Sequence, residues 1–184
     1  VCNLDKSLFH SSSLVEKERG IPLNRSLDDI GRGIPSTYVP ARNIVFLSLA
    51  VAYAEVIDAD AVFIGVHSTD YSGYPDCRPD FIESFQDAVN KGTKRGVEGK
   101  PIEIKTPLLY LSKTDIIEKG LEVKAPFELT WSCYKGEDKA CGSCDSCLIR
   151  LKGFQEAGYP DPIPYYSYPS WYNPKRLKKR LDKD

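Results

Sequence analysis

Residues 44–57 read IVFLSLAVAYAEVI, and residues 61–66, three residues further on, read AVFIGV. The first stretch is apolar on nearly every side, contains no Gly or Pro and is too long for an ordinary strand, so it predicts a buried helix. The second stretch is a short continuous apolar run, which is typical of a central strand in a parallel sheet. A buried helix leading directly into a buried strand indicates an α/β fold.

The alternation of helix and strand continues along the chain. Ser112 with Asp115 has the form of a helix cap, and Gly120 is a suitable residue to end that short helix. The further expected elements are a helix over 78–89, a strand over 102–106, a helix over 112–120 and a helix over 145–157 that stops at Gly158. This order predicts a parallel sheet with helices on both faces. Ligands of such sheets bind beyond the carboxyl ends of the strands, so a site is expected in the loop after Val66.

Composition sets limits on the class of protein. The chain has 184 residues, of which 41% are apolar and 28% charged, with a formal net charge of −1. These values fit a globular domain and indicate neither disorder nor a strongly basic nucleic-acid binder. No apolar run approaches the ~18 residues of a membrane-spanning helix, and residues 1–6 lack a signal-peptide pattern. A cytoplasmic protein is therefore expected. The chain has no methionine and opens as if in mid-strand, so we also expect a missing amino-terminal segment.

Four of the six cysteines form the pattern C-x7-C-x2-C-x2-C: Cys133, Cys141, Cys144 and Cys147. Four thiolates can close a tetrahedral shell around Zn²⁺ with no open position, so the pattern predicts a structural zinc site within residues 130–150. Gly142 helps the chain bend between two ligands. Free or disulfide-bonded cysteines are the plain alternative, and an iron–sulfur cluster is a second one, although no cysteine follows to complete a ferredoxin spacing. Cys77 is expected to be a small packed residue, and Cys2 a core strand residue.

The loop from His67 to Arg78 reads HSTDYSGYPDCR. It gathers carboxylates, phenols, small hydroxyls and a guanidinium at the expected ligand edge of the sheet, a set that can stack on a flat heterocycle and hydrogen-bond to its edge. Such residues are also common in turns. The residues alone therefore favour a binding loop only slightly.

Several blocks of this sequence together resemble the 7-cyano-7-deazaguanine synthase family. The blocks, within about residues 30 to 160, are Thr37-Tyr38-Val39-Pro40-Ala41-Arg42-Asn43; Phe63-Ile64-Gly65-Val66 with Asp70-Tyr71-Ser72-Gly73-Tyr74-Pro75-Asp76-Cys77-Arg78-Pro79; Pro107-Leu108 with Leu111-Ser112-Lys113; Thr130-Trp131-Ser132-Cys133-Tyr134; and Cys141-Gly142-Ser143-Cys144-Asp145-Ser146-Cys147. The resemblance implies an adenine nucleotide alpha hydrolase-like fold of the pyrophosphate-loop ATPase group. It also implies a ligase that makes 7-cyano-7-deazaguanine from 7-carboxy-7-deazaguanine, ammonia and ATP with Mg²⁺, for queuosine or archaeosine biosynthesis, and a homodimer.

The resemblance also suggests roles for individual residues. Activation of a carboxylate by ATP needs fixed positive charge near the phosphates and the reacting oxygen, for which Lys113 and Arg42 are the candidates. Asp70 and Asp76 are expected to accept hydrogen bonds from the deazaguanine, with Tyr71 or Tyr74 stacking on it, and His67 is a minor candidate for proton transfer. The complete set of expected substrate-binding residues is Asp70, Tyr71, Ser72, Tyr74, Asp76 and Arg78.

Two parts of the chain depart from the family pattern. The family's Ser-Gly-Gly-x-Asp-Ser ATP loop is absent, so residues 1–160 are expected to form an incomplete pyrophosphate-loop domain that cannot make the adenylate alone, with a mobile loop over 8–24. Residues 161–184 form an aromatic and basic tail. Aromatic and basic residues together can bind single-stranded nucleic acid, but packing of the aromatics on the domain or on a partner subunit is favoured. The rival functions are another amide-forming or tRNA-modifying enzyme of the pyrophosphate-loop group and a zinc-ribbon nucleic-acid-binding module.

Overall fold

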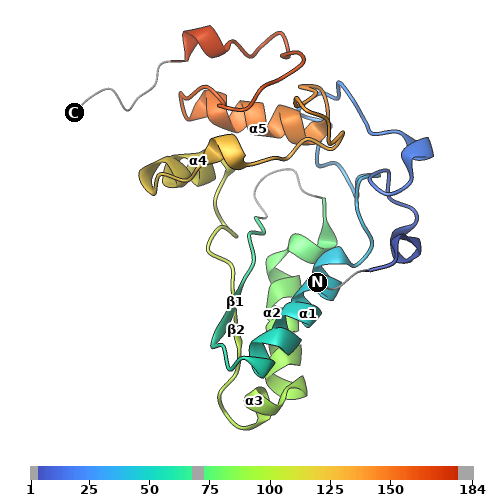
Figure 1. Cartoon of the computed structure of the whole chain (residues 1–184), viewed down its shortest axis with the longest axis vertical. Helices are drawn as coiled ribbons and strands as arrows, with labels where there is room; N and C mark the ends of the chain where they lie inside the picture. Colours follow the sequence, from blue (N-terminus) through green and yellow to red (C-terminus); the bar gives the residue numbers. More distant parts are fainter. Residues whose placement is uncertain (1–3, 68–72, 178–184) are drawn as a thin grey trace.

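The computed structural model describes residues 4–67 and 73–177, and Figure 1 shows their arrangement. The regular elements follow the order α1 (Arg42–Val56), β1 (Ala61–Phe63), α2 (Pro79–Gly92), α3 (Lys94–Val97), β2 (Glu103–Lys105), α4 (Lys113–Glu122) and α5 (Asp145–Glu156), with 3-10 turns at Lys6–Phe9, Lys17–Arg19, Pro75–Cys77, Phe127–Leu129 and Pro174–Arg176. In Figure 1 the helices α1 to α3 and both strands form one part. The helices α4 and α5 form a second part, beyond the carboxyl ends of the strands.

The two strands pair in parallel, as the alternating order predicts, with Val62 opposite Ile104. The helices α1 and α2 lie on the same side of this pair (Figure 1). Leu47 of α1, Ile82 of α2 and Ile104 of β2 are buried together in one hydrophobic cluster. The α/β class and the parallel pairing are thus confirmed, whereas helices on both faces and the adenine nucleotide alpha hydrolase-like fold stay predictions.

The expected helices lie within a few residues of the observed ones, but both strands are shorter than expected. The expected end of the third helix is wrong, because α4 runs through Gly120 to Glu122. A Cβ at Gly120 would lie 2.4 Å from the Phe127 ring, so this glycine permits close packing within a helix. The expected cap at its start is confirmed: the Asp115 amide donates to Ser112 Oγ at 3.1 Å, and the Ser112 amide donates to Asp115 Oδ2 at 2.9 Å. The Ser112 hydroxyl also donates to Asp115 Oδ2 at 2.7 Å, and this hydrogen bond, together with the one from the Ser112 amide, lowers the pKa of Asp115.

The helices α4 and α5 pack against each other through a small apolar cluster of their own. Ile117 of α4 and Phe154 of α5 are almost completely buried, and Phe127 meets Phe154 edge-on with ring centroids 5.3 Å apart. Gly153 of α5 lies directly against α4, where an added Cβ would be 2.7 Å from Lys113 Cγ. Close packing of the two helices thus fixes the position of the amino-terminal end of α4.

The amino-terminal segment differs from the expected mobile loop. Ser12 is completely buried and Ser13 is 3% exposed, and the Ser13 amide donates to the Ser36 carbonyl at 2.8 Å. Further along, the Asn24 amide donates to the Ser143 carbonyl at 2.8 Å, next to an antiparallel bridge between Leu23 and Cys144. The Asn24 hydrogen bond and the Leu23 bridge hold this segment against the cysteine-containing loop, and the Ser13 hydrogen bond ties it to the residues before α1.

In the part of the tail that the structure describes, aromatic side chains pack on the domain, as the sequence favours. The Ala140 amide donates to the Pro164 carbonyl, and the Tyr166 amide donates to the Ala140 carbonyl, both at 2.9 Å. Tyr165 and Tyr172 are buried, at 9% and 4% exposed, whereas Trp171 remains 38% exposed. Of the basic run at residues 175–180, Lys175 and Arg176 are exposed, and residues 178–180 lie outside the described residues.

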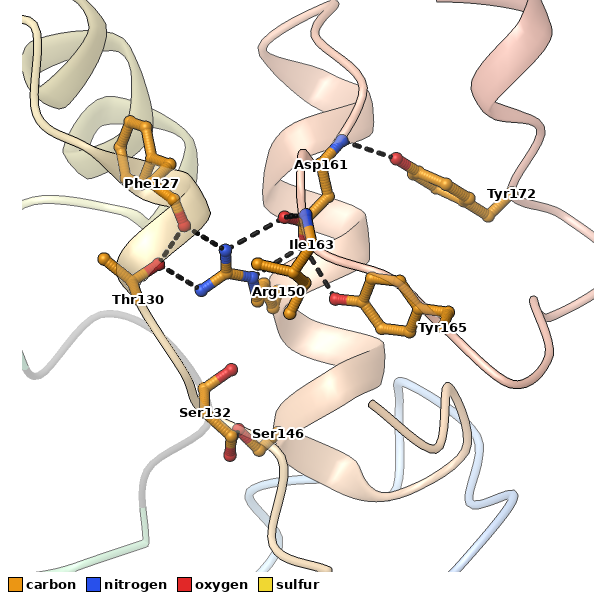
Figure 2. Close-up of polar contacts among 9 residues, drawn as sticks. All are labelled: Phe127, Thr130, Ser132, Ser146, Arg150, Asp161, Ile163, Tyr165 and Tyr172. Atoms are coloured by element: carbon orange, nitrogen blue, oxygen red, sulfur yellow. Dashed lines mark hydrogen bonds and ion pairs between the residues drawn. The ribbon is translucent and has the colours of Figure 1, made fainter. Parts of the chain in front are cut away.

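A buried ion pair fastens the tail to α5, as Figure 2 shows. Arg150 donates from Nε to Asp161 Oδ2 at 2.6 Å and from Nη2 to Asp161 Oδ1 at 2.9 Å. Its Nη1 donates to Thr130 Oγ1 at 2.8 Å, and the Tyr165 hydroxyl donates to Asp161 Oδ2 at 2.7 Å. The Asp161 side chain is fully buried, so its charge depends on this one guanidinium for compensation.

None of the helices in the described ranges is long and apolar enough to cross a membrane. The outer side of α1 is nevertheless apolar. Phe46, Tyr53 and Val56 are 50%, 65% and 81% exposed, and Phe63 of β1 is 71% exposed.

We expect Asp161→Asn to lower the free energy of unfolding by about 3–5 kcal/mol, because it leaves the Arg150 guanidinium buried without its counter-charge. Urea unfolding followed by circular dichroism measures the change. Asp138→Asn removes the same charge from an exposed position and should change stability by no more than about 0.5 kcal/mol. The double variant Arg150→Met/Asp161→Leu should lose less than the sum of its two single variants. Equal stability of Asp161→Asn and the unaltered chain would contradict this account.

Candidate functional site

The four cysteines of the sequence pattern meet at one point in the fold. All four are buried, and the Sγ atoms of Cys133, Cys141, Cys144 and Cys147 lie within 4.8 Å of one another. The Sγ atoms of Cys141 and Cys147 are 3.9 Å apart. A tetrahedral zinc ion with Zn–S bonds of about 2.3 Å would hold its sulfur ligands about 3.8 Å apart. The described residues therefore fit a metal ion held by four thiolates.

Backbone geometry around the cluster favours thiolates. The Cys141 amide donates to Cys133 Sγ at 3.3 Å, and the amides of Ser143 and Cys144 donate to Cys141 Sγ at 3.4 and 3.3 Å. Gly142 makes this turn possible, since its φ is +75° and a Cβ would lie 1.9 Å from the Ser167 carbonyl oxygen of the tail. The expected role of Gly142 in bending the chain is confirmed.

The electrostatics of the thiols show what a cation contributes. A hydrogen bond from Cys147 lowers the pKa of Cys144 to about 5, and the same hydrogen bond raises the pKa of Cys147. Burial raises the pKa of Cys133. Four thiolates this close repel one another, so the full set is stable only around a positive ion. Cys77 is packed, as expected, and belongs to the α/β core; burial raises its pKa to about 11.

A cavity of about 300 Å³ lies beside the cysteine loop. Its walls come from the amino-terminal segment, from His67 and Tyr74, from α4, from the segment around Cys133 and from α5. The residues that line it are Ile30, Gly31, Pro35, Thr37, His67, Tyr74, Lys113, Ile116, Ile117, Phe127, Thr130, Ser132, Tyr134, Asp145, Ser146, Ile149, Arg150 and Phe154. We call it the first cavity. Its mixture of apolar walls with a few polar groups is typical of a small-molecule site.

A second cavity, of about 340 Å³, opens at the carboxyl end of β1, where a parallel sheet is expected to bind its ligand. Arg42 and Asn43 at the start of α1 line it, together with residues 64–67 and Cys77. His67 and Tyr74 line both cavities. The two spaces are therefore neighbours across these two side chains.

A chain of hydroxyls joins the wall of the first cavity to the cysteine loop. Tyr74 shares one hydrogen bond with Thr37 Oγ1 at 2.8 Å and another with the Tyr134 hydroxyl at 3.2 Å. Burial raises the pKa of Tyr134, so this phenol stays protonated and can donate a hydrogen bond. Tyr134 directly follows Cys133, so the cysteine loop contributes to the wall of the cavity.

The structure places the expected catalytic residues at the two cavities. Lys113 lies in the first cavity, where its Nζ is 2.8 Å from His67 Nε2. Arg42 lies in the second cavity. A lysine after a helix cap is usually solvated, but packing against Gly153 of α5 directs this one inward.

The expected substrate-binding set is divided. Tyr74 lines both cavities, whereas Asp76 is buried away from them, and its Oδ2 accepts from the Asn43 amide at 3.0 Å. Asp76 thus caps the start of α1 from outside the helix. Arg78 is exposed just before α2 and lines neither cavity. Asp70, Tyr71 and Ser72 lie outside the described residues, as does Cys2.

The model of the family described as queuosine biosynthesis protein QueC matches residues 2–158 of this chain. The chain belongs to the QueC family. A protein of Nostoc sp. named 7-cyano-7-deazaguanine synthase is 54% identical over 165 residues, which are 90% of this chain and 72% of that protein. Proteins of the same name from Acetivibrio thermocellus and Thermoplasma volcanium are 66% and 53% identical; the matches cover 72% and 85% of this chain and 60% and 65% of those proteins.

Sequence reasoning missed several residues of this QueC-family cavity. Ser132 and Asp145 stand inside blocks that carry the resemblance, yet Asp145 served only as the start of a helix and Ser132 received no role. Thr37 and Tyr134 were likewise quoted without a function. For Ser132, Tyr134 and Asp145 the available signal is that each directly adjoins a cysteine of the cluster, whereas Thr37 carries no such signal.

We expect the purified chain to contain one tightly bound zinc ion, measured by mass spectrometry of the metal content. Cys144→Ser should lose this metal and unfold at a lower temperature, because a structural site stabilises the fold directly. Cys77→Ser, a buried cysteine outside the cluster, is the matched control and should keep it. Full metal content in Cys144→Ser would contradict a four-thiolate site.

Gly153→Ala should lower stability and displace Lys113, because its new Cβ would lie 2.7 Å from Lys113 Cγ and 2.9 Å from Ile117 Cδ1. We expect a loss of about 1–3 kcal/mol, the usual cost of overpacking. Gly92→Ala, in open space at the end of α2, should be neutral or slightly stabilising. Urea unfolding compares the two, and an equal effect of both would refute the proposed tight contact.

Proposed function

We propose that this chain carries the substrate cavity of an ATP-dependent ligase that converts 7-carboxy-7-deazaguanine and ammonia into 7-cyano-7-deazaguanine for queuosine or archaeosine biosynthesis. One observation carries the proposal. Residues from five separate blocks that relate the chain to this family, among them Thr37, Tyr74, Lys113, Tyr134 and Asp145, converge on one cavity large enough for a single flat heterocycle. A shared ancestry that preserved only the fold would not require these blocks to meet at one cavity.

The chemistry of the reaction explains the need for ATP. A carboxylate resists attack by ammonia because its charge is delocalised. Its oxygen attacks the α-phosphorus of ATP, and pyrophosphate leaves. Ammonia then attacks the acyl carbon of the adenylate, loses a proton and displaces AMP to give the amide. The amide oxygen then attacks the α-phosphorus of a second ATP, and a second pyrophosphate leaves. Loss of AMP and of both nitrogen protons leaves the nitrile. Each step places negative charge on oxygen, which fixed cationic groups stabilise.

Lys113 and Arg42 would supply this charge on the two sides of His67 and Tyr74. Lys113 would hold the substrate carboxylate in the first cavity. Arg42, at the carboxyl end of β1, would face the phosphates of ATP with Mg²⁺ in the second cavity, the edge at which parallel sheets bind nucleotides. His67, which contacts the Lys113 ammonium, orients that group rather than acting alone.

Zinc in the four-cysteine site would be structural, because four thiolates leave no position for water or substrate. The metal would hold the loop that carries Ser132, Tyr134 and Asp145 against the first cavity. The exposed apolar side of α1 is of the kind that subunit interfaces cover, which agrees with the homodimer that the resemblance implies.

Turnover should be assayed on the protein made from its complete gene, with ATP, ammonia and 7-carboxy-7-deazaguanine, by mass spectrometry of the nitrile. Lys113→Met should lower kcat/KM by about a hundredfold, the usual effect of removing an electrostatic contact to the reacting oxygen. Lys119→Met, an exposed lysine of the same helix, is the matched control and should remain within about twofold. Absence of nitrile with the unaltered protein would disprove the function, and full activity of Lys113→Met would disprove the role of Lys113.

A further inference from the structure

The first cavity contains a carboxylate of which only one oxygen is used. Asp145, the first residue of α5, is 5% exposed. Arg25 Nη1 donates to its Oδ2 at 2.9 Å. Its Oδ1 is buried and has no hydrogen-bond partner among residues 4–67 and 73–177. A buried charged acceptor without a donor is costly to a fold, so this oxygen indicates a binding position for a ligand with an N–H group.

Ser132 presents a second polar atom to the same space. Its carbonyl accepts a hydrogen bond from Ser146 Oγ at 2.6 Å, which fixes the backbone beside α5, and Figure 2 shows the two serines next to each other. The Ser132 hydroxyl is buried and has no partner in the described part of the chain. A hydroxyl can donate as well as accept. The cavity therefore combines an acceptor for N–H groups with a donor for a carbonyl oxygen.

We propose that Asp145 and Ser132 form the subsite that binds the amino-lactam edge of a 7-deazapurine acid. This inference rests on the proposed function and adds to it which of the two flat heterocycles in the reaction occupies the first cavity. The guanine-like acid binds there, and the adenine of ATP does not.

The pattern of donors and acceptors makes the choice. The amino-lactam edge carries a ring N–H and an exocyclic amino group beside a carbonyl oxygen, so its donors face Asp145 Oδ1 and its oxygen faces the Ser132 hydroxyl. An adenine ring carries an acceptor nitrogen where the guanine-like ring carries its N–H. That lone pair would face the carboxylate oxygen, and a buried acceptor pair is repulsive.

The position of Lys113 fits a ligand of this size. Gly153, which contacts the Lys113 side chain, lies eight residues after Asp145 on α5, a separation of about 12 Å along the helix axis. A bicyclic ring with its amino-lactam edge at Asp145 and its carboxylate toward Lys113 fits this span with a hydrogen bond at each end. Ile30, Ile149 and Phe154 supply apolar walls for the faces of the ring.

Ligand binding by the 184-residue chain tests the subsite. Isothermal titration would compare 7-carboxy-7-deazaguanine with its analogue in which hydrogen replaces the 2-amino group. The unaltered chain should bind the amino compound at least about tenfold more tightly, the usual effect of a hydrogen bond to a charged group. In Asp145→Asn, Arg25 would hold the amide oxygen, so the amide N–H groups would face the ligand's own donors. This variant should bind the amino compound at least about tenfold less tightly and should no longer discriminate between the two ligands.

Two controls separate recognition from folding. Asp138→Asn removes an exposed carboxylate from the same cysteine loop and should keep both affinities. Metal content and thermal unfolding of Asp145→Asn are measured alongside, since Asp145 adjoins the ligand Cys144. Ser132→Ala provides a second, milder variant and should weaken both ligands equally, because each retains the carbonyl.

Each outcome is decisive. Undiminished discrimination by Asp145→Asn, or equal binding of the two ligands by the unaltered chain, would overturn the subsite and leave the proposed function standing. Tighter binding of adenosine than of the amino compound, with its loss in Asp145→Asn, would assign the first cavity to ATP and overturn the inference. Nitrile formation by the complete protein together with either result would show that only the subsite is wrong. Absence of both nitrile formation and binding of the acid would overturn the function and the subsite together.

Discussion

Four sulfur atoms within 4.8 Å of one another are the constraint on which the part of the structure around α5 depends. The loop that carries them has little regular structure of its own. The amino-terminal segment pairs with it at Cys144, the tail pairs with it at Ala140, and α5 begins inside it at Asp145. Repulsion between buried thiolates opposes this arrangement unless a cation is present. The positions of the amino-terminal segment, the tail and α5 therefore all depend on the four-cysteine cluster.

The two cavities are built from different parts of the chain. Parallel strands and the packed helices α1 and α2 form a conventional framework that ends at the second cavity. The first cavity is lined both by the helices α4 and α5 and by irregular segments, and the cysteine loop and the ion pair between Arg150 and Asp161 hold these parts together. In the irregular segments, not all polar groups are engaged in the hydrogen bonds of a helix or sheet, so some can bind a ligand.

The sequence predicted features that depend on local pattern, and it failed where the answer depends on distant packing. Continuous apolar runs indicated α1 and β1, and cysteine spacing indicated the cluster, because both patterns are set by neighbours in the chain. The role of Asp76 in ligand binding stays a prediction, but no local pattern indicated that it caps α1 through Asn43, thirty-three residues away. Gly120 was expected to end a helix, but its small size serves contact with Phe127. The inward direction of Lys113 depends on Gly153, on a different helix, and no local pattern contains that information.

The hydroxyl chain from Thr37 through Tyr74 to Tyr134 couples the first cavity to the four-cysteine cluster. Tyr134 is covalently next to a sulfur ligand, and Tyr74 separates the two cavities. A ligand that orders these hydroxyls must therefore also restrain the loop that holds the ion. Coupling free energies between sites are reciprocal. Occupancy of the cavity should raise the affinity of the cysteine loop for a metal ion by the same factor by which the ion raises the affinity for the ligand, so equilibrium competition with a chelator becomes a measure of ligand binding.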